Sequence, residues 1–410
     1  MRVIVPGAMG KQGRGALWYL LRQDDVSEIV VGARRIEQVR DLVSRLGDKR
    51  LAPQSIDLSD IESTVNVFKG ANVVVNCAYE GYPTDKSYMN LEIPATKAAL
   101  EAGANYTNLG GSPPAPEQLA LSDMFQNKGI LAVLGMGELT GHLQIMATYA
   151  INRIDRTDSI DIKYGERDLV PPEQHNRPIP WGPRPGTKGK TDFAYAGLGA
   201  TRFRYGSNSA SIEEGKLRYD PPRAHPEVFV FKEPIGGATI AQTPGAAAIS
   251  LSRSFPEIKH ISFKAGGDPS FETKVNFLRD LGFFNTKPIN VQGMLISPWE
   301  VLVALLEQLP LEKNPADIVS EARVIVRGQE AGKEVEYTFS WTRISSDRVR
   351  EDVVPSSGLC AAIAGLMVAR GQAKGTGVLM PEICIPPEKY LDEFVKTGKG
   401  EIEISRKMKL

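Results

Sequence analysis

The chain has 410 residues, of which 42% are hydrophobic and 24% are charged. This length exceeds that of an ordinary single domain and predicts roughly two or three domains. Because 49 Lys and Arg residues balance 49 Asp and Glu residues, no net charge favours nucleic acid or an anionic membrane as a partner. No apolar run approaches the ~20 residues that a membrane helix needs, and the three cysteines lack metal-ligand spacing. We therefore expect a cytoplasmic protein with reduced thiols, without a signal peptide and without a bound metal.

The first third of the chain alternates short apolar runs with helix-like segments. The run at 71–78 lacks polar alternation, which is typical of a strand buried on both faces of a parallel sheet. Ser59 is the expected N-cap of the helix after the third strand, and a single helix is expected over 116–129. This order predicts an α/β fold with a doubly wound parallel sheet of the Rossmann type. The expected strands cover residues 3–5, 28–35, 50–57, 71–78, 105–111 and 130–137.

A cluster of glycines follows the first expected strand, at the point where strand gives way to helix. Gly7, Gly10 and Gly13 are equally spaced. Gly7 lets the chain turn sharply, Gly10 lets the backbone approach a pyrophosphate, and Gly13 lets the helix pack closely on the sheet. The N–H groups of the first helical turn then point at the anion. Glycines also mark plain turns, but this position at the start of repeated β-α units predicts dinucleotide binding.

The end of the second expected strand bears on which dinucleotide is bound. An NAD site usually places Asp or Glu there, to accept a hydrogen bond from the ribose 2′-hydroxyl. Here the strand ends in Arg34 and Arg35, and two guanidinium groups suit a 2′-phosphate. We therefore predict NADP, with NAD as the alternative if both arginines are solvated charges at a helix start. The residues predicted to hold the cofactor are Gly7, Met9, Gly10, Lys11, Gly13, Arg34, Arg35, Asp57, Asn76, Cys77 and Ala78.

Beyond about residue 143 the hydrophobic pattern changes to period two, with a hairpin turn expected at 328–333. This pattern predicts a second, α+β domain built on a mixed sheet. Small and apolar residues fill 356–371, which favours a buried helix. The expected division is a dinucleotide-binding domain over 1–142, a substrate-binding and dimerisation domain over 143–350, and a C-terminal segment over 351–410 that packs back on the first domain.

The second domain contains a long segment, 169–190, that is rich in proline and glycine. A loop of that length in a compact domain is often functional. Trp181 could form an aromatic wall and Arg184 a carboxylate clamp over the active site, or Trp181 could anchor a surface loop. Arg202 and Arg204 would share one face of a strand. They are further predicted substrate ligands, unless they belong to a basic outer face of a sheet.

Several segments resemble the saccharopine dehydrogenase-like family in sequence and in order. They are the glycine turn, "GARR" at 32–35, "GANVVVNCA" at 70–78, "KAALEAGANYTNLGG" at 97–111, "GILAVLGMGELTG" at 129–141 and, most specific, "SSGLCAAIAGLMVARGQAKGTGVLMPE" at 356–382. The resemblance spans nearly the whole chain and is loosest over 165–255. It implies hydride transfer between a nicotinamide ring and a carbon that bears nitrogen, on an amino acid or polyamine adduct. It also implies a homodimer formed through the second domain's sheet.

Two positions depart from the family pattern. Asn108 stands where the family often has Asp, and 137–141 read Gly-Glu-Leu-Thr-Gly instead of a Gly-x-Asp-Pro-Gly-like turn. Both positions lie where substrate is bound or a proton is handled. The resemblance also places a lysine near the substrate, at Lys97. We predict Lys97 as the first catalytic residue, with Glu80 and Asn108 beside it, although Lys97 could be a solvated helix residue.

Three functions follow from these observations. The leading hypothesis is an NADP-preferring oxidoreductase that reduces an imine, as in saccharopine reductase, or oxidises the corresponding amine. The second is an NAD-dependent amine deaminase of the lysine 6-dehydrogenase type. The third is a dinucleotide-binding regulatory protein without turnover, which Asn108 and the altered turn at 137–141 keep open.

Overall fold

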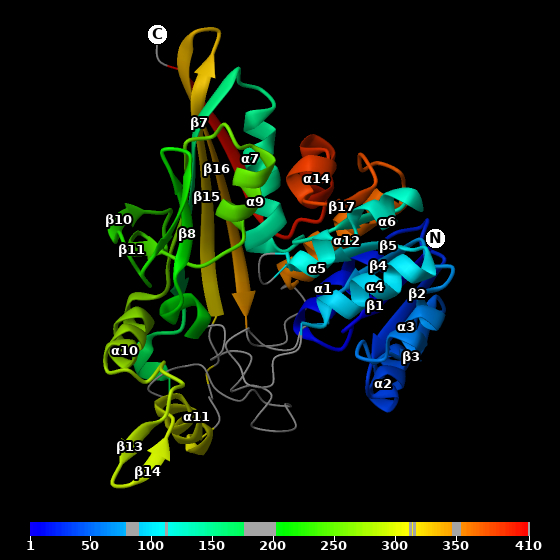
Figure 1. The fold of residues 1–410 in the computed structure, drawn as a ribbon, viewed down its shortest axis with the longest axis horizontal. Coiled ribbons are helices and arrows are strands. Elements are labelled where there is room, and N and C mark those ends of the chain that lie inside the picture. The colour runs from blue at the N-terminus through cyan, green and yellow to red at the C-terminus, as the bar shows by residue number, and fades with distance from the viewer. Residues whose placement is uncertain are drawn as a thin grey trace.

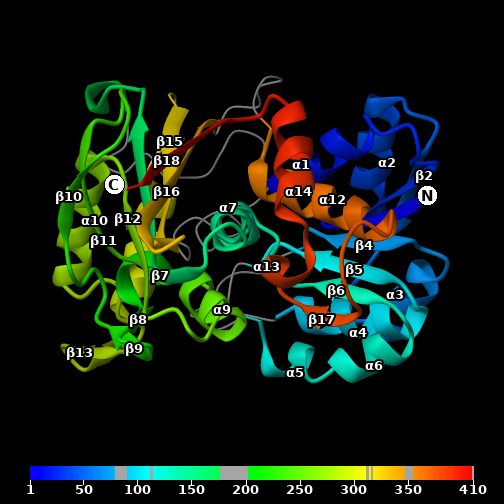
Figure 2. The ribbon, with the colours of Figure 1, turned by 90° about the horizontal axis from the view of Figure 1, so that it is seen from above.

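The structure, a computed structural model, describes residues 1–78, 90–110, 114–175, 202–310, 314, 317–346 and 354–408. These residues form two units that stand side by side in Figure 1, one built on a parallel sheet and the other on a mixed sheet. Helix α7 (Leu143–Ile151) lies between them, and Figure 2 shows it nearly end-on at the centre of the molecule. The predicted fold class, a Rossmann-type sheet followed by a mixed-sheet domain, is confirmed.

All seven strands of the first sheet run parallel, in the order β17-β6-β5-β4-β1-β2-β3. The six expected strands are present, and the seventh, β17, arrives from the C-terminal part of the chain. Both faces are apolar because alternate residues of each strand enter two different cores. The bounds are β1 (Arg2–Pro6), β2 (Glu28–Ala33), β3 (Leu51–Ser55), β4 (Val73–Asn76), β5 (Asn105–Asn108), β6 (Leu131–Val133) and β17 (Gly377–Leu379).

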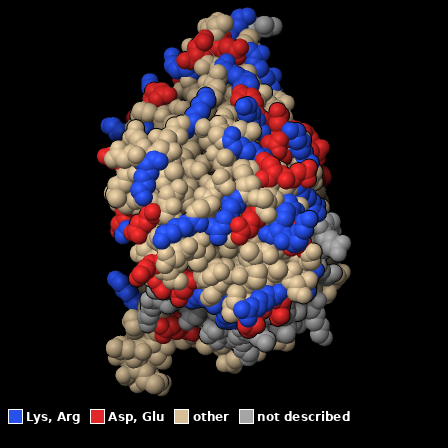
Figure 3. All heavy atoms as spheres, turned by 90° about the vertical axis from the view of Figure 1, so that its right-hand side faces the viewer, with Lys and Arg blue, Asp and Glu red and all other residues tan. Residues whose placement is uncertain are grey.

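Helices cover both faces of this sheet. Helices α1 (Lys11–Leu20), α2 (Ile36–Leu46) and α12 (Ser356–Ala369) share a core on one face. Helices α3 (Ile61–Phe68), α4 (Glu92–Ala102) and α6 (Ser122–Asn127) share the core on the other. Figure 3 shows the side of the first unit that lies on the right in Figure 1. There Lys and Arg residues lie interspersed with Asp and Glu residues among uncharged ones. No field of a single sign therefore extends over that face.

Two local expectations differ from the structure. The segment expected as one helix over 116–129 forms two short helices, α5 (Pro116–Leu119) and α6, because the chain turns between them. The N-cap of α3 is Asp60, whose carboxylate accepts from the Ser63 amide at 3.1 Å, and not Ser59. The Ser59 hydroxyl instead donates to Asp57 at 2.6 Å, since the helix starts one residue later than expected.

The second sheet has nine strands, in the order β10-β11-β12-β7-β15-β16-β18, with β8 paired to β12 and β9 paired to β8. The expected hairpin is confirmed as β15 and β16, which pair along their whole length. The bounds are β7 (Arg156–Asp168), β8 (Ser209–Glu213), β9 (Lys216–Asp220), β10 (Glu227–Val230), β11 (Gly237–Gln242), β12 (His260–Gly266), β15 (Asp317–Glu330), β16 (Lys333–Ser346) and β18 (Glu401–Met408). The remaining elements are the π-helical turn η1 (Glu138–His142), η2 (Pro172–Gln174), α9 (Ala247–Ser254), α10 (Pro269–Asp280), β13 (Ile289–Val291), β14 (Met294–Ile296), α11 (Pro298–Gln308), α13 (Pro381–Cys384) and α14 (Pro387–Lys396).

One face of the mixed sheet is directed at the first unit. Its apolar side chains, among them Ile162, Val324 and Phe339, belong to the same core as α7 and as helices α1 and α12. Helix α12 packs closely on α1, since a Cβ at Gly358 would lie 1.7 Å from the Gln12 carbonyl oxygen. The C-terminal part of the chain then adds β17 to the first sheet and β18 to the second. It therefore connects both units, and the two sheets share one core.

Candidate functional site

The turn after β1 has the backbone geometry of a pyrophosphate cradle. Gly7 has φ +74°, and a Cβ there would lie 2.4 Å from the Ala78 amide nitrogen. A Cβ at Gly13 would lie 2.3 Å from the Gly7 carbonyl oxygen, so the helix approaches the turn as the sequence predicted. Gly10 is the N-cap of α1 and provides no side-chain cap. No side chain of the N-cap residue therefore stands between the first turn of α1 and an anion, and these residues fit a bound dinucleotide.

The predicted ribose-side residues lie on the same edge of the sheet. Because β1 and β2 pair in parallel with Pro6 opposite Gly32, Arg34 and Arg35 follow β2 next to the glycine turn, and both are exposed. Hydrogen bonds from Ser59 lower the pKa of Asp57, and the charge of Arg34 contributes. A guanidinium and a carboxylate thus stand together where the ribose is expected. In the turn itself, Met9 and Lys11 are half-buried.

The residues after β4 shape the turn that faces Gly7. The Asn76 side chain accepts from the Ala78 amide at 3.0 Å and donates to the Tyr106 hydroxyl at 3.1 Å. Cys77 is buried, and this burial raises the pKa of its thiol to about 12. The thiol is therefore protonated at neutral pH and unreactive. Asn76 acts on the backbone of the turn rather than offering a free amide to a ligand.

Two of the predicted catalytic residues lie on neighbouring elements of the first unit. Asn108 is 1% exposed, and its side chain accepts from the Gly135 amide at 2.7 Å, which links the ends of β5 and β6. Lys97 lies on the exposed side of α4, while Ala98 and Ala99 face the sheet. Their roles in the reaction stay predictions. Glu80, Trp181 and Arg184 lie outside the described residues.

A buried acid near this edge was not predicted. Glu92 is the first residue of α4 and is 8% exposed. Burial raises the pKa of Glu92 to about 7, although the Gly110 amide partly offsets this effect. A carboxyl that titrates near neutrality can exchange a proton with a substrate. In the sequence it could not be told from an ordinary acidic residue in the first turn of a helix.

The face of the mixed sheet that is directed at the first unit carries a row of polar groups across three strands. Glu166 on β7 lies opposite Ser320 on β15, which lies opposite Arg343 on β16. The Tyr164 hydroxyl donates to Glu166 at 2.7 Å. Burial raises the pKa of the Tyr164 phenol, and the Glu166 carboxylate raises it further. The Arg204 guanidinium lies 3.9 Å from the other oxygen of Glu166.

This polar row reaches the first unit through one ion pair. Arg343 donates from Nη2 to Glu138 Oε1 at 2.8 Å. Glu138 belongs to the turn after β6, at the carboxyl edge of the parallel sheet, and its amide donates to the Ser357 hydroxyl oxygen at 3.4 Å. The turn that departs from the family pattern is thus one of the places where the two units touch. The charged row therefore faces the edge where the dinucleotide is predicted to bind.

The two arginines predicted as a pair separate in the structure. Residues 202–206 are helical and not a strand, so side chains two apart diverge. Arg204 reaches Glu166 in the polar row, whereas Arg202 donates to the Phe284 carbonyl at 3.2 Å and lies over the Trp299 ring. Farther along β7, Asp168 binds His175 Nε2 at 3.1 Å, and both side chains are nearly buried. Arg204 is the member of the predicted pair that joins the other charged groups.

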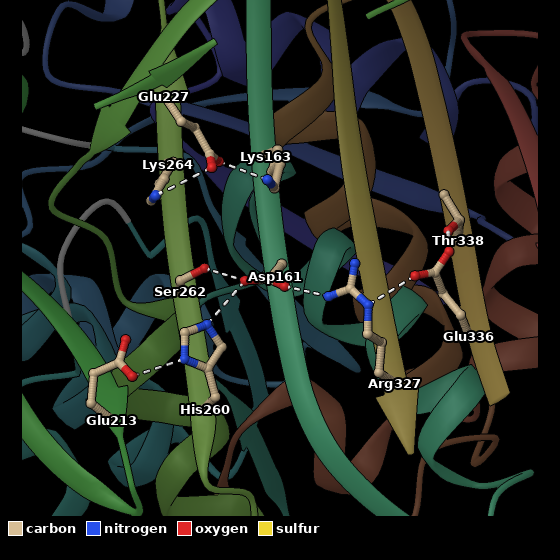
Figure 4. A network of polar contacts seen from close by, with 10 residues as sticks. All are labelled: Asp161, Lys163, Glu213, Glu227, His260, Ser262, Lys264, Arg327, Glu336 and Thr338. Carbon is tan, nitrogen blue, oxygen red and sulfur yellow. Dashed lines mark hydrogen bonds and ion pairs between the residues drawn. The ribbon is translucent and has the colours of Figure 1, made fainter. Parts of the chain in front are cut away.

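The opposite face of the mixed sheet carries a separate polar network, shown in Figure 4. Asp161 lies 3.1 Å from His260 Nε2 and accepts from Ser262 and Arg327, both at 2.6 Å. Glu213 lies 3.1 Å from His260 Nδ1. The hydrogen bond with Asp161, and then that with Glu213, raises the pKa of His260 to about 8, although burial opposes them. This network faces away from the first unit and from the predicted cofactor edge.

Three features of the described residues bear on the remaining sequence expectations. None of the helices in the described part of the chain combines the length and apolar character needed to cross a bilayer. The cysteines Cys77, Cys360 and Cys384 are buried and form no disulfide. Among the residues with described positions, no cluster of His, Cys, Asp and Glu could hold a metal ion.

Comparison with known proteins adds two family matches. The saccharopine dehydrogenase NADP binding domain matches residues 3–133, and the saccharopine dehydrogenase C-terminal domain matches residues 192–399. The chain is 21% identical to carboxynorspermidine synthase of Vibrio cholerae over 413 residues, which cover 92% of this chain and 90% of that protein. It is also 21% identical to carboxyaminopropylagmatine dehydrogenase of Synechocystis over 403 residues, with the same coverage. The solved structure of apo saccharopine dehydrogenase (L-Glu forming) from Saccharomyces cerevisiae has a TM-score of 0.70 at 16% identity, covers 100% of both chains, and shows the same fold.

Proposed function

Because this chain belongs to the saccharopine dehydrogenase family and is a nicotinamide-dependent oxidoreductase, we propose that it prefers NADP and acts on a carbon–nitrogen bond. In the reducing direction its substrate is the imine formed between an amine and a carbonyl compound. In the oxidising direction it is the corresponding secondary amine. The observation that carries this proposal is the charged row of the second sheet, which contacts the carboxyl edge of the first sheet through the ion pair of Arg343 with Glu138.

The cofactor preference rests on Arg34 and Arg35. Both are exposed beside the glycine turn, and the charge of Arg34 helps to lower the pKa of Asp57. The guanidinium groups suit the 2′-phosphate that distinguishes NADP from NAD. When the dinucleotide is bound with its pyrophosphate in the cradle, its nicotinamide ring would supply or accept the hydride. The chain's own residues hold the dinucleotide through Gly7, Gly10 and Gly13.

The substrate class follows from the charges of the opposite wall. Two guanidinium groups, of Arg204 and Arg343, alternate with the carboxylates of Glu166 and Glu138. Such a wall suits a zwitterion, since it offers partners to a carboxylate and to a protonated amine. The names of carboxynorspermidine synthase and carboxyaminopropylagmatine dehydrogenase describe amines that carry a carboxyl group. We propose the same class, a carboxylated polyamine or amino acid adduct.

One group must deliver a proton to the imine nitrogen when the carbon is reduced. Lys97 remains our first proposal, with Glu80 and Asn108 beside it. Its helix starts at the carboxyl edge of the sheet, and Lys97 follows Glu92 by about 7.5 Å along the axis. Glu92 itself is a second donor, because burial brings the pKa of its carboxyl to about 7. The proton would reach nitrogen while the two units exclude water.

We also propose that the protein is a homodimer that joins through the mixed sheet. The edge strand β10 supports this proposal, because Val228 is 75% exposed and Val230 is 68% exposed on it. Exposed apolar side chains on an edge strand favour pairing with another chain. Sedimentation should give twice the mass of the chain, and a Val228→Lys, Val230→Lys variant should shift it to the mass of one chain.

The reaction is tested in both directions. Carboxynorspermidine or saccharopine is added with NADP⁺, and formation of NADPH is followed by its absorbance. In reverse, an amine and a carboxylated aldehyde are added with NADPH, and the secondary amine is identified by mass. We expect turnover with at least one carboxylated amine. The proposal fails if the protein binds NADPH but oxidises or reduces none of these compounds.

A further inference from the structure

Ser320 stands at the centre of the polar row on the second sheet. Its Cα pairs with that of Glu166 on one side and with that of Arg343 on the other. Side chains at such cross-strand positions have Cβ atoms about 5 Å apart. The Ser320 hydroxyl therefore lies next to both a carboxylate and a guanidinium. Ser320 is 1% exposed, so bulk water does not supply a hydrogen-bond partner for its hydroxyl.

Two donors in this row have no acceptor. Ser320 Oγ and Arg343 Nε are both buried, and neither has a hydrogen-bond partner among the described residues. The Arg343 side chain is only 9% exposed, and its Nη2 already donates to Glu138. A buried polar group without a partner is unfavourable, because it has lost its hydrogen bonds to water. Two such donors on adjacent strands indicate that an acceptor belongs between them.

The other face of the same sheet shows the contrast. There the buried hydroxyls of Ser262 and Ser340 each donate to a carboxylate, Asp161 and Glu321 respectively, both at 2.6 Å. The guanidinium of Arg323 is likewise bound to Glu321. These three side chains of the outer face are thus satisfied within the protein, whereas Ser320 Oγ and Arg343 Nε in the polar row are not.

We propose that Ser320 Oγ and Arg343 Nε bind the carboxylate of the substrate, an inference that rests on the proposed function and assigns one part of its site. A carboxylate accepts hydrogen bonds and donates none, and its two oxygens suit a hydroxyl and a guanidinium N–H on neighbouring strands. The positive charge of Arg343 stabilises the anion. Glu166 lies on the other side of Ser320 from Arg343. Its carboxylate favours a protonated nitrogen of the substrate at that position and disfavours a second carboxylate.

The arrangement also predicts how the substrate enters. Both donors are shut off from solvent while Glu138 contacts Arg343. Entry of the carboxylate therefore requires the contact between Glu138 and Arg343 to open. When this contact forms again, it buries the charged groups, which strengthens their interaction.

The test uses two ligands that differ by one carboxyl group, carboxynorspermidine and norspermidine. Their binding to the full chain with NADP⁺ is measured by calorimetry, in the unmodified protein and in Ser320→Ala and Arg343→Lys variants. Ser262→Ala and Arg323→Lys are the matched controls on the outer face. We expect each inner-face substitution to weaken carboxynorspermidine binding about tenfold. Norspermidine and NADPH binding should not change, and the controls should bind all three ligands as the unmodified protein does.

A variant that has lost its fold would lose NADPH binding as well, so NADPH affinity separates unfolding from loss of the subsite. In steady-state kinetics the two variants should raise KM for the carboxylated amine with little change in kcat, as loss of uniform binding does. The inference is overturned if the variants weaken both ligands equally, weaken neither, or if the unmodified protein prefers norspermidine. The proposed function fails separately, when no amine of either kind is turned over.

Discussion

Glu138 and Arg343 are joined by an ion pair of 2.8 Å that links the turn after the last central strand of the parallel sheet to the mixed sheet. The two residues are 205 positions apart in the chain. Their contact places a charged row of the second unit at the edge where the dinucleotide is predicted to bind. Removing the Glu138 carboxylate is therefore expected to weaken the contact between the two units at this turn.

Glu138→Ala should destabilise the protein, because it leaves the Arg343 guanidinium buried and without its acceptor. We expect a loss on the order of 2 kcal/mol, below the range for a fully buried pair, since the Glu138 side chain is 21% exposed. Urea unfolding measures the change. Glu37→Ala is the matched control, because its pair with Arg40 is exposed and should contribute less than about 1 kcal/mol. Equal effects of the two substitutions would contradict the structural role of the ion pair.

Gly10→Val should weaken NADPH binding at least about tenfold, or about 1.4 kcal/mol, without unfolding the protein. A Cβ at Gly10 meets only the Gly7 carbonyl oxygen, at 3.3 Å, but a branched side chain would occupy the space of the pyrophosphate. Fluorescence titration with NADPH measures affinity, and circular dichroism checks the fold. Gly237→Val is the control, since a Cβ there meets nothing within 4 Å. A folded Gly10→Val protein with unchanged affinity would remove the cradle assignment.

The unmodified protein should bind NADPH more tightly than NADH, because Arg34 and Arg35 follow β2 beside the cradle. Replacing both with alanine should narrow the difference by at least about tenfold, as charge-assisted hydrogen bonds to the phosphate are lost. Arg40→Ala, on the helix α2 that follows these two arginines, should leave the cofactor preference unchanged, because Arg40 is paired with Glu37. Equal affinity for the two cofactors in the unmodified protein would contradict the proposed preference.

Lys97→Met should lower kcat while NADPH affinity stays unchanged, since we propose that Lys97 touches the substrate and not the cofactor. The side chain is exposed on α4, so the substitution should not affect the free energy of unfolding by more than about 0.5 kcal/mol. Lys69→Met, at another exposed lysine, is the control. Equal turnover in both variants would contradict the role of Lys97 as proton donor. Glu92 or Glu80 would then be the candidate donor, and Glu92→Gln would be the substitution that tests it.

The network on the outer face predicts a pH dependence of stability. The pKa of His260 is raised from 6.5 to about 8, first by its hydrogen bond with Asp161. A raised pKa means that the folded state binds the proton more tightly than the unfolded state does. The contribution is therefore complete below pH 6.5 and is lost as pH rises through about 8.

The measurement compares urea midpoints of the unmodified protein and His260→Gln between about pH 6 and about pH 9. The difference in urea midpoint between the two proteins should decrease as the pH rises across this interval. His225→Gln, whose side chain is 64% exposed, should show little difference from the unmodified protein at any pH. A His260→Gln difference that stays constant or grows with pH would contradict the assignment.

Local patterns accounted for most of the first unit. The apolar runs, the helix-like segments between them and the glycine turn each depend on a few neighbouring residues, and they predicted the parallel sheet and its phosphate edge. The same holds for the hairpin of β15 and β16, which a short turn specifies. Local signals were less reliable at element ends, where the N-cap of α3 is Asp60 and not Ser59.

The sequence by itself determined the Rossmann-type sheet, the position of the cradle and the two arginines beside it, because strand, turn and helix arise from contacts near in the chain. Only the tertiary structure decided which polar residues form the opposite wall. Glu166, Ser320 and Arg343 lie on three strands that meet by long-range pairing, and nothing in their sequence neighbours marks them. The structure likewise separated Arg204 from Arg202, because their segment is helical. Burial at an interface between distant segments creates such a site, and burial is a property of the packed chain rather than of any short stretch of it.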